Sequence, residues 1–221
     1  MAHPTRMTTV LGIDPGSQVT GYAFLRQNID RSTTVLECGA IRPPRGAELA
    51  ERLLFIADAL ESKINSHGPD MLCMESAFVS LNARSALVLG HVRGAVMVLS
   101  ARHGLHFREI SPSEVKRCVT GSGAADKEQV ANMVCRLLRI ARPEGPADIT
   151  DALAIAWSHL GMPVMPVSAH PAPAPLKKSL PARVSTVSAR QSSNHIATAL
   201  PAGTDAQAFL LAHGRKRSKR R

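Results

Sequence analysis

Residues 8–25 read TTVLGIDPGSQVTGYAFL, and this stretch is the strongest indication of how the chain folds. An apolar run over 10–13 ends at Asp14, and the turn dipeptide Pro15-Gly16 follows at once. A second apolar run occupies 20–25. Short apolar runs separated by a proline–glycine turn are typical of neighbouring strands. The pattern therefore predicts two strands that lie side by side, with a carboxylate at the end of the first.

The rest of the first 161 residues alternates between strand-like and helix-like patterns. Apolar residues recur at helical spacing over 47–67, whereas 71–74 is a compact apolar run that leads into Glu75. These patterns predict an α/β fold, a mixed five-stranded sheet with helices on both faces. The expected strands are 10–14, 20–25, 32–41, 71–74 and 107–110, and the expected helices are 47–67, 82–103, 111 to the glycine-rich break at 121, 126–140 and 148–161.

The positive charge of the chain is concentrated at its C-terminal end. The formal net charge is +10, yet residues 1–161 carry 17 basic and 16 acidic side chains, whereas residues 162–221 carry 10 basic side chains and one acidic. Pro, Ala, Ser and Thr dominate 163–206, and such a mixture cannot build a packed core. We expect a flexible N-terminus over 1–7, a folded domain over 8–161 and a disordered basic tail beyond it.

A basic chain suggests an anionic partner, with nucleic acid first and an acidic protein or a membrane surface as alternatives. The final GRKRSKRR is typical of a nuclear-localisation or nucleic-acid-binding run, and also of a solvated basic tail that adds non-specific affinity. Both interpretations of the tail stay open.

The cysteines and the hydropathy suggest a compartment. Cys38, Cys73, Cys118 and Cys135 are far apart, without the spacing of a zinc site or a disulfide framework. The N-terminus has no apolar core of a secretory signal, and no apolar run is as long as a membrane span. We therefore expect a cytoplasmic protein that has no membrane partner.

Four acidic residues fall where they could share one site. Asp14 and Glu75 each end a predicted strand, and Asp148 and Asp151 are three apart at the start of the last predicted helix. Each also has an ordinary interpretation: a turn residue, a strand exit into solvent, or a helix N-terminus with a favourable dipole contact. Neighbouring strand ends lie together, and helix residues three apart share a face at roughly 5 to 6 Å between β-carbons. We therefore expect the four acids to converge.

Four carboxylates in one site repel one another and raise one another's pKa values unless cations lie among them. Oxygen ligands favour Mg²⁺ or Mn²⁺ over zinc. Two such ions, roughly 3.5 to 4 Å apart, neutralise four negative charges, orient a water and stabilise the leaving oxygen of a phosphodiester. The residues thus predict metal-dependent phosphodiester hydrolysis.

Four segments carry a resemblance to a known family: LGIDPGSQVTGYAFL, MESAFVSLNARSALVLGHVRGAV, SPSEVKRCVTGSGAADKEQV and DITDALAIAWSH, in this order. Over residues 8–161 the chain resembles the RuvC family of Holliday-junction resolvases. The resemblance implies a ribonuclease H-like fold and a homodimer whose two Mg²⁺-dependent sites make paired, symmetric nicks in four-way DNA during recombination and repair. It also implies the branch-migration proteins RuvA and RuvB as partners. By motif position the catalytic, metal-binding acids are Asp14, Glu75, Asp148 and Asp151.

The same resemblance suggests residues that contact DNA. Lys116 and Lys127 match basic positions near the scissile phosphate, and Phe78 matches an aromatic that stacks on exposed bases. Without the resemblance, the lysines would be interpreted as solvated helix residues and Phe78 as a core residue, as Trp157 is. Ser76 departs from the glutamine of many relatives, and the SLNAR loop lacks a lysine often found before the asparagine.

Two other function classes compete with a junction endonuclease. The GID-x-G pattern also resembles the first phosphate loop of actin-like and sugar-kinase ATPases, but those proteins bind nucleotide between two such domains, and about 160 ordered residues provide one. A non-catalytic junction-binding protein with a degenerate site is the other alternative, and the presence of all four acids opposes it. Gly90 and Gly94 lie on one face of the expected helix 82–103, which is our candidate for part of a dimer interface.

Overall fold

The computed structural model describes residues 7–76 and 83–161. Every predicted strand and helix is present with small shifts at the ends. The last turn before the final helix shows one such shift: Arg139 adopts a left-handed conformation with φ 56° and ends α4 at Leu138, before the expected end at 140. The elements are β1 (Thr8–Asp14), β2 (Thr20–Gln27), β3 (Thr33–Ile41), α1 (Leu49–His67), β4 (Met71–Glu75), α2 (Ala83–Arg102), β5 (His106–Ile110), α3 (Pro112–Thr120), α4 (Lys127–Leu138) and α5 (Asp148–Gly161).

Three predictions fall outside these ranges. They are the flexible N-terminus, except for its last residue, the basic tail over 162–221, and Phe78. Within the two ranges that the structure describes, no helix is both long enough and apolar enough to cross a bilayer.

The five strands form one mixed sheet in the order β3-β2-β1-β4-β5. β1 pairs antiparallel with β2 and parallel with β4, and β4 pairs parallel with β5. In this register Ile13 lies opposite Met74, so the next residues, Asp14 and Glu75, end two neighbouring parallel strands at the same edge. The predicted mixed five-stranded sheet is therefore confirmed.

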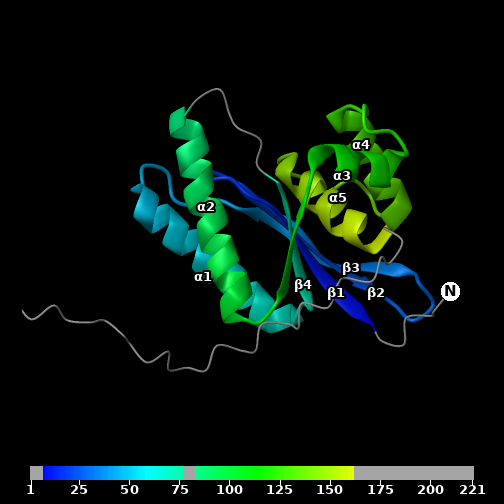
Figure 1. Cartoon of the computed structure of the whole chain (residues 1–221), viewed down its shortest axis with the longest axis horizontal. Helices are drawn as coiled ribbons and strands as arrows, with labels where there is room; N and C mark the ends of the chain where they lie inside the picture. The colour runs from blue at the N-terminus through cyan, green and yellow to red at the C-terminus, as the bar shows by residue number, and fades with distance from the viewer. Residues whose placement is uncertain (1–6, 77–82, 162–221) are drawn as a thin grey trace, which may run out of the picture. The chain divides into compact units, whose positions relative to one another are not determined.

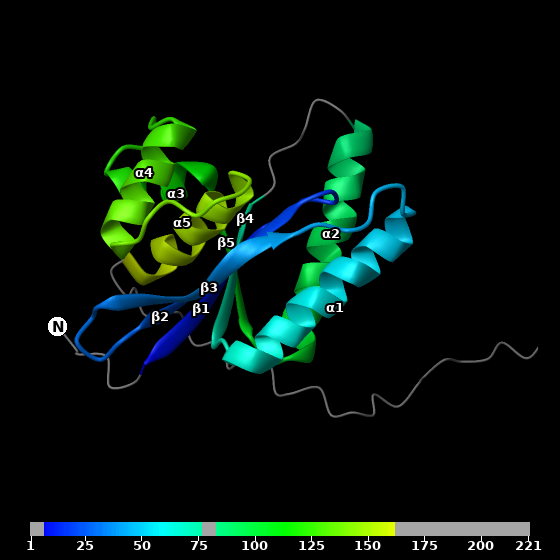
Figure 2. The ribbon, with the colours of Figure 1, turned by 180° about the vertical axis from the view of Figure 1, so that it is seen from behind.

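Helices cover both faces of the sheet, as predicted (Figure 1). Alternate residues of β1 point to opposite sides: Leu11 and Ile13 pack with α1 and α2, whereas Val10 packs with α3, α4 and α5. The view from behind shows the same two layers, with α1 and α2 on one side of the strands and α3–α5 on the other (Figure 2). Burial on both faces explains why β1 reads as a continuous apolar run instead of an alternating one.

Two glycines let α5 lie directly on the backbone of the sheet. A β-carbon built on Gly12 would be 2.3 Å from the backbone oxygen of Ala152, and one built on Gly21 would be 1.9 Å from the backbone oxygen of Asp148. No real side chain fits at such distances, so both positions require glycine. Because Gly21 is the register partner of Asp14 on β2, the first turn of α5 begins beside the end of β1.

The glycines of α2 have a different environment. A β-carbon added at Gly90 or Gly94 would find no atom within 4 Å, so this face of α2 is not packed against another described helix. The close helix approach that such spacing often permits is therefore absent within the described part of the chain.

Gly21→Ala should destabilise the protein strongly. The new methyl group would overlap the carbonyl of Asp148, and relief requires α5 to move away from β2. We expect a loss of at least about 2 kcal/mol in the free energy of unfolding, within the range for overpacked cores, measured by urea denaturation.

The matched control is Gly123→Ala, where the nearest atom to the built β-carbon is 3.6 Å away, an ordinary contact. Its unfolding free energy should stay within about 0.5 kcal/mol of wild type. Equal stabilities of the two variants would contradict the close packing of α5 on β2.

Candidate active site

The structure brings the four predicted acids to one edge of the sheet. Asp14 ends β1 and Glu75 ends β4, while Asp148 and Asp151 lie in the first turn of α5. Parallel pairing of β1 with β4 brings the first two together, and the contact of Asp148 with Gly21 brings the helix to the same point. Residues that are 137 positions apart in the chain thus become neighbours because the sheet and one helix end converge.

Burial within the cluster and repulsion between its acids perturb the protonation of Asp14 and Glu75. Burial raises the pKa of Asp14 to about 7, and repulsion from Asp151, Asp148 and Glu75, in that order, adds to the effect, while Lys127 opposes it. Burial also raises the pKa of Glu75, and Asp151 adds to that rise. An acid whose pKa lies near 7 is half neutral at physiological pH, so the cluster reduces its own repulsion by holding a proton.

The donor set fits a hard divalent cation by its chemistry. All four side chains offer oxygen ligands, and a cation among them would relieve the repulsion that raises the pKa of Asp14. The side-chain positions are not those of a closed coordination shell, however. Among residues 7–76 and 83–161, no three His, Cys, Asp or Glu side chains are arranged to hold one ion together. The four acids therefore lie close enough for their charges to act on Asp14, as expected, but their side chains are not arranged as ligands of one ion.

The sequence matches the family model described as "Crossover junction endodeoxyribonuclease RuvC" over residues 10–159. The chain belongs to the RuvC family. A RuvC of Chlorobaculum parvum is 48% identical over 151 residues, which cover 68% of this chain and 80% of that protein.

Solved RuvC structures share the fold. A Thermus thermophilus RuvC matches with a TM-score of 0.64 at 27% identity, over 70% of this chain and 94% of that one. The same protein solved in complex with a Holliday junction substrate matches with a TM-score of 0.63 at 25% identity, again over 70% and 94%. The ribonuclease H-like fold expected from the sequence is thereby confirmed.

Both lysines suggested by the RuvC resemblance lie beside the acids. Lys127 begins α4, and its Nζ is 3.4 Å from Oδ2 of Asp151, while its side chain remains 84% exposed. Lys116 on α3 lies close enough to lower the pKa of Glu75. The cluster therefore has a basic rim on the α3–α4 side. Phe78 lies outside the described residues, and Trp157 packs partly buried against the core, as expected.

Sequence reasoning missed Arg93. This residue of α2 is only 8% exposed, and its guanidinium donates hydrogen bonds to the backbone carbonyl of Glu75 and to the carboxylate of Glu109. One signal was present in the sequence: Arg93 lies at helical spacing among the apolar residues Val92, Val96 and Leu99, which are buried with it on the inward side of α2. A charged residue at a core position of a helix indicates a specific buried partner.

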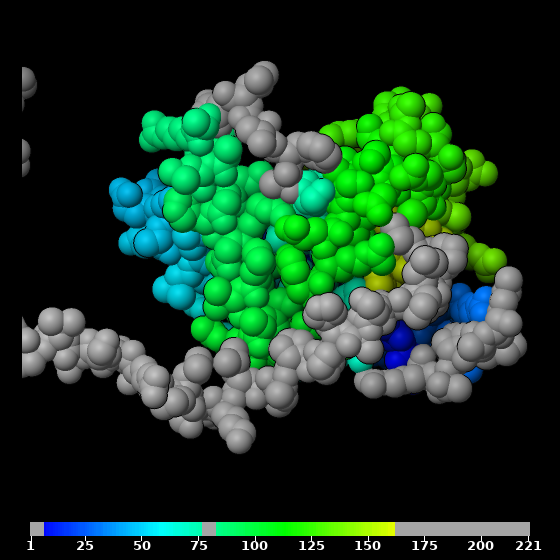
Figure 3. All heavy atoms as spheres, viewed as in Figure 1, coloured from blue at the N-terminus to red at the C-terminus, as the bar shows by residue number. Residues whose placement is uncertain are grey.

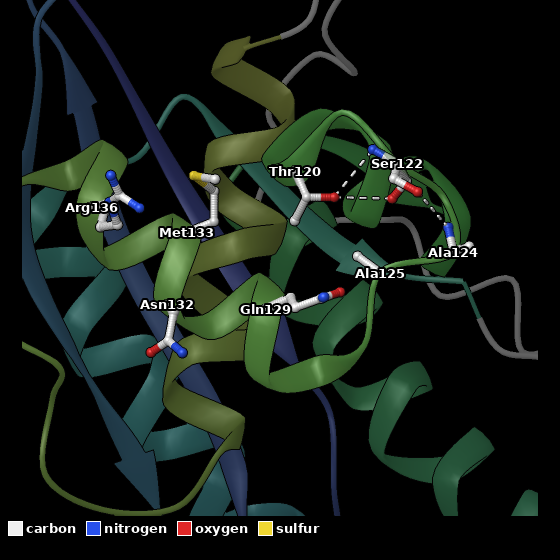
Figure 4. Close-up of a pocket in the computed structure, with 8 residues that line it drawn as sticks. All are labelled: Thr120, Ser122, Ala124, Ala125, Gln129, Asn132, Met133 and Arg136. Atoms are coloured by element: carbon white, nitrogen blue, oxygen red, sulfur yellow. Dashed lines mark hydrogen bonds between the residues drawn. The ribbon is translucent and has the colours of Figure 1, made fainter.

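A cavity of about 520 Å³ lies away from the acids. It is formed by the α3–α4 turn and one side of α4, and its lining includes Thr120, Gln129 and Arg136 (Figure 4). Thr120 is already bonded locally: its Oγ1 donates to the carbonyl of Lys116 at 2.8 Å and accepts from the Ser122 amide at 3.2 Å. None of the four acids lines this cavity, and we assign no function to it.

The raised pKa of Asp14 predicts a pH-dependent stability in the absence of metal. The folded state holds this proton more tightly than the unfolded chain, whose pKa is near 3.8, so stability decreases as pH rises from about 4 to about 7. Asp14→Asn cannot ionise. In chelator at pH 8 its Tm should exceed that of wild type by at least about 3 °C, and at pH 5 the difference should be less than half as large, as measured by calorimetry.

Asp58→Asn, which removes an exposed carboxylate from α1, is the control and should show no such pH-dependent gain. A lower Tm of Asp14→Asn at pH 8 would mean that the turn role of the aspartate outweighs the repulsion.

Proposed function

We propose that this protein is a Holliday-junction resolvase, an endonuclease that cuts four-way DNA by paired symmetric nicks in recombination and repair. The observation that carries the proposal is the meeting of four carboxylates at the ends of β1 and β4 and the start of α5, in a chain of the RuvC family. We assign the catalytic and metal-binding roles to Asp14, Glu75, Asp148 and Asp151, with Mg²⁺ or Mn²⁺, two ions a site, as the cofactor.

Each group then has a role that follows from its charge. When bound, the ions would supply Lewis acidity to the phosphodiester and lower the pKa of the attacking water. The four acids would determine where the ions bind. Lys127 and Lys116 supply positive charge at the rim, where a phosphate would otherwise meet the negative cluster, and a lysine suits this task as a point charge. Phe78 keeps its proposed stacking role on junction bases.

The two competing functions are less well supported. An ATPase of the actin or sugar-kinase type needs two domains around its nucleotide, and the described residues form one sheet with its helices. A purely binding protein has no need of four mutually repelling carboxylates, which cost folding free energy without metal. ATP turnover in the absence of DNA would revive the first alternative, and junction binding without any cutting would favour the second.

Glu75→Gln should abolish nicking while junction binding persists. The substitution keeps the shape of the side chain and removes its charge. Loss of a residue that only supports a metal ligand already lowers activity by up to about 100-fold, so loss of a ligand should lower the cut rate to less than about one-hundredth of wild type. The assay uses a labelled synthetic four-way junction with and without Mg²⁺, with cuts mapped on all four arms.

Asp58→Asn serves again as the control and should cut like wild type. Paired nicks on opposing arms, dependent on Mg²⁺, are the expected wild-type result. Unpaired cutting of linear duplex at a similar rate would mean a general nuclease, and equal loss of cutting and binding in Glu75→Gln would indicate damage to the fold.

We further propose that the protein acts as a homodimer through one face of α2. Leu87, Gly90, Gly94 and Val98 are spaced three or four residues apart and define this α2 face. Leu87 is 67% and Val98 58% exposed, and the two glycines leave room for a close approach. The helix forms much of one surface of the molecule in the space-filling view (Figure 3). Two active sites, needed for paired nicks, require a second copy.

Val98→Glu should convert the dimer to a monomer at micromolar concentration, because a charge on the α2 face would be buried without a partner. Analytical ultracentrifugation gives the mass, and the same samples should change from paired to single nicks. Ile29→Glu, at a residue 60% exposed in the β2–β3 connection, is the control and should leave the mass unchanged. A monomeric wild type would contradict the proposed dimer.

The remaining assignments complete the proposal. We place the nuclease domain at residues 8–161, followed by the basic tail. The branch-migration proteins RuvA and RuvB are the partners expected of the family, and the cytoplasm is the compartment that agrees with the free cysteines found among the described residues.

A further inference from the structure

Arg93 is a buried cation whose two contacts join three elements. It lies on the inner face of α2 and is only 8% exposed. A guanidinium in such a place is costly unless it is paired and hydrogen-bonded. Here one terminal nitrogen donates to the backbone carbonyl of Glu75, the last residue of β4, and the other to the carboxylate of Glu109 on β5. The arginine thus holds α2 against the ends of two parallel strands.

The contact with Glu75 is made to its main chain and not to its carboxylate. The side chain of Glu75 therefore remains available to the acid cluster while its backbone is held. One further bond fixes the same point: the amide of Ser76 donates to the carbonyl of Ile110 at 2.8 Å. The peptide between Glu75 and Ser76 is thus held at both of its polar groups: its carbonyl accepts from Arg93, and its amide donates to Ile110. The two bonds together fix the end of β4.

We propose that Arg93 is a positioning residue that holds the backbone of Glu75 so that its carboxylate faces Asp14 and Asp151. The inference rests on the proposed function for its catalytic consequence, while the anchoring itself is independent of it. At 8% exposure Arg93 does not reach bound DNA, so its effect on cutting passes through Glu75. Outer-shell groups of this kind orient the ligands of metal sites.

An ordinary structural ion pair is the competing explanation. Glu109 is 46% exposed in its side chain, so its pairing with Arg93 is partly screened by solvent. Glu109→Gln keeps an oxygen that accepts from Arg93 and should change little. Arg93→Met keeps much of the length and apolar character of the side chain and removes both hydrogen bonds. Arg93→Lys keeps a charge, but its single nitrogen lacks the planar fork that reaches both acceptors.

The first test needs neither metal nor DNA. Hydrogen exchange of the Ser76 amide reports how firmly the end of β4 is held. In chelator, Arg93→Met should accelerate this exchange by about tenfold or more, as expected for loss of a hydrogen bond to a charged group, and Arg93→Lys should fall between Met and wild type. The amide of Gly121, which caps the end of α3 and donates to the carbonyl of Arg117 at 2.9 Å, should not change.

The second test separates positioning from binding in the full-length protein. With Mg²⁺ and a four-way junction, Arg93→Met should lower kcat by about 10- to 100-fold and leave KM for the junction within twofold. Arg93→Lys should recover part of kcat. The concentration of Mg²⁺ at half-maximal cutting should rise for Arg93→Met, because a displaced Glu75 is a poorer ligand.

Lys63→Met is the matched control. Lys63 is a partly buried cation on α1, 26% exposed, that pairs with Glu37 on β3 and lies 4.5 Å from the ring centre of Tyr22. Its loss removes a comparable ion pair on a different helix, so Tm should fall while kcat stays within twofold of wild type.

Each outcome decides the proposal. Unchanged Ser76 exchange in Arg93→Met, or wild-type kcat, would overturn it, as would a fall in cutting that matches the fraction of unfolded protein. If the wild type cuts no junction at all, the proposed function fails, and the exchange measurement still decides whether Arg93 anchors the end of β4.

Discussion

The close contact between α5 and the backbones of β1 and β2 is the constraint on which the site depends. Gly12 and Gly21 remove the side chains that would otherwise separate helix from sheet; Ala152 and Ala156 of α5 meet Gly12, and the backbone of Asp148 meets Gly21. If side chains at positions 12 and 21 held α5 farther from the sheet, Asp148 and Asp151 would be out of reach of Asp14. The same contact sets the N-terminal end of α5 at the acidic edge. There the partial positive charge of the helix end offsets part of the repulsion between acids.

Three cations that differ in their exposure offset part of the remaining negative charge around Glu75. Lys127, Lys116 and Arg93 each lower the pKa of Glu75, so all three act on the same negative potential. Lys127 has a largely exposed side chain, so it can also approach a phosphate. Arg93 is buried and bound to a carbonyl and a carboxylate, so it can act only on the geometry and charge of its neighbours. Three residues that lower the pKa of the same glutamate thus have different roles.

Much of the site was predictable because its acids follow simple patterns. Asp14 and Glu75 directly end apolar runs, and the parallel return of β4 beside β1 brings such ends together. The capping residues Ser111 and Asp126 mark the starts of α3 and α4 by rules that depend only on nearby residues. The element order and both covered faces followed from such local signals.

What the sequence could not provide depends on contacts between distant segments. Nothing in the spacing of α2 reveals that Arg93 reaches the carbonyl of Glu75, because that bond requires the register of β4 against β5 and the rotation of the helix. The need for glycine at 12 and 21 becomes visible only when α5 lies over them. The ligand geometry of the acids is also beyond spacing rules, because side-chain rotamers in a repelling cluster respond to the charges around them.

The two faces of α2 link these features in one element. The outward side of the helix is the α2 face, from Leu87 to Val98. On the inward side, Arg93 donates a hydrogen bond to the backbone carbonyl of Glu75. A 20-residue helix moves largely as a unit over such short distances, and α2 is held on its inner side by Val92, Val96 and Leu99. Any displacement of α2 by a second copy would therefore move Arg93, and with it the end of β4. The proposed dimer contact and the position of Glu75 are therefore coupled, because both depend on α2.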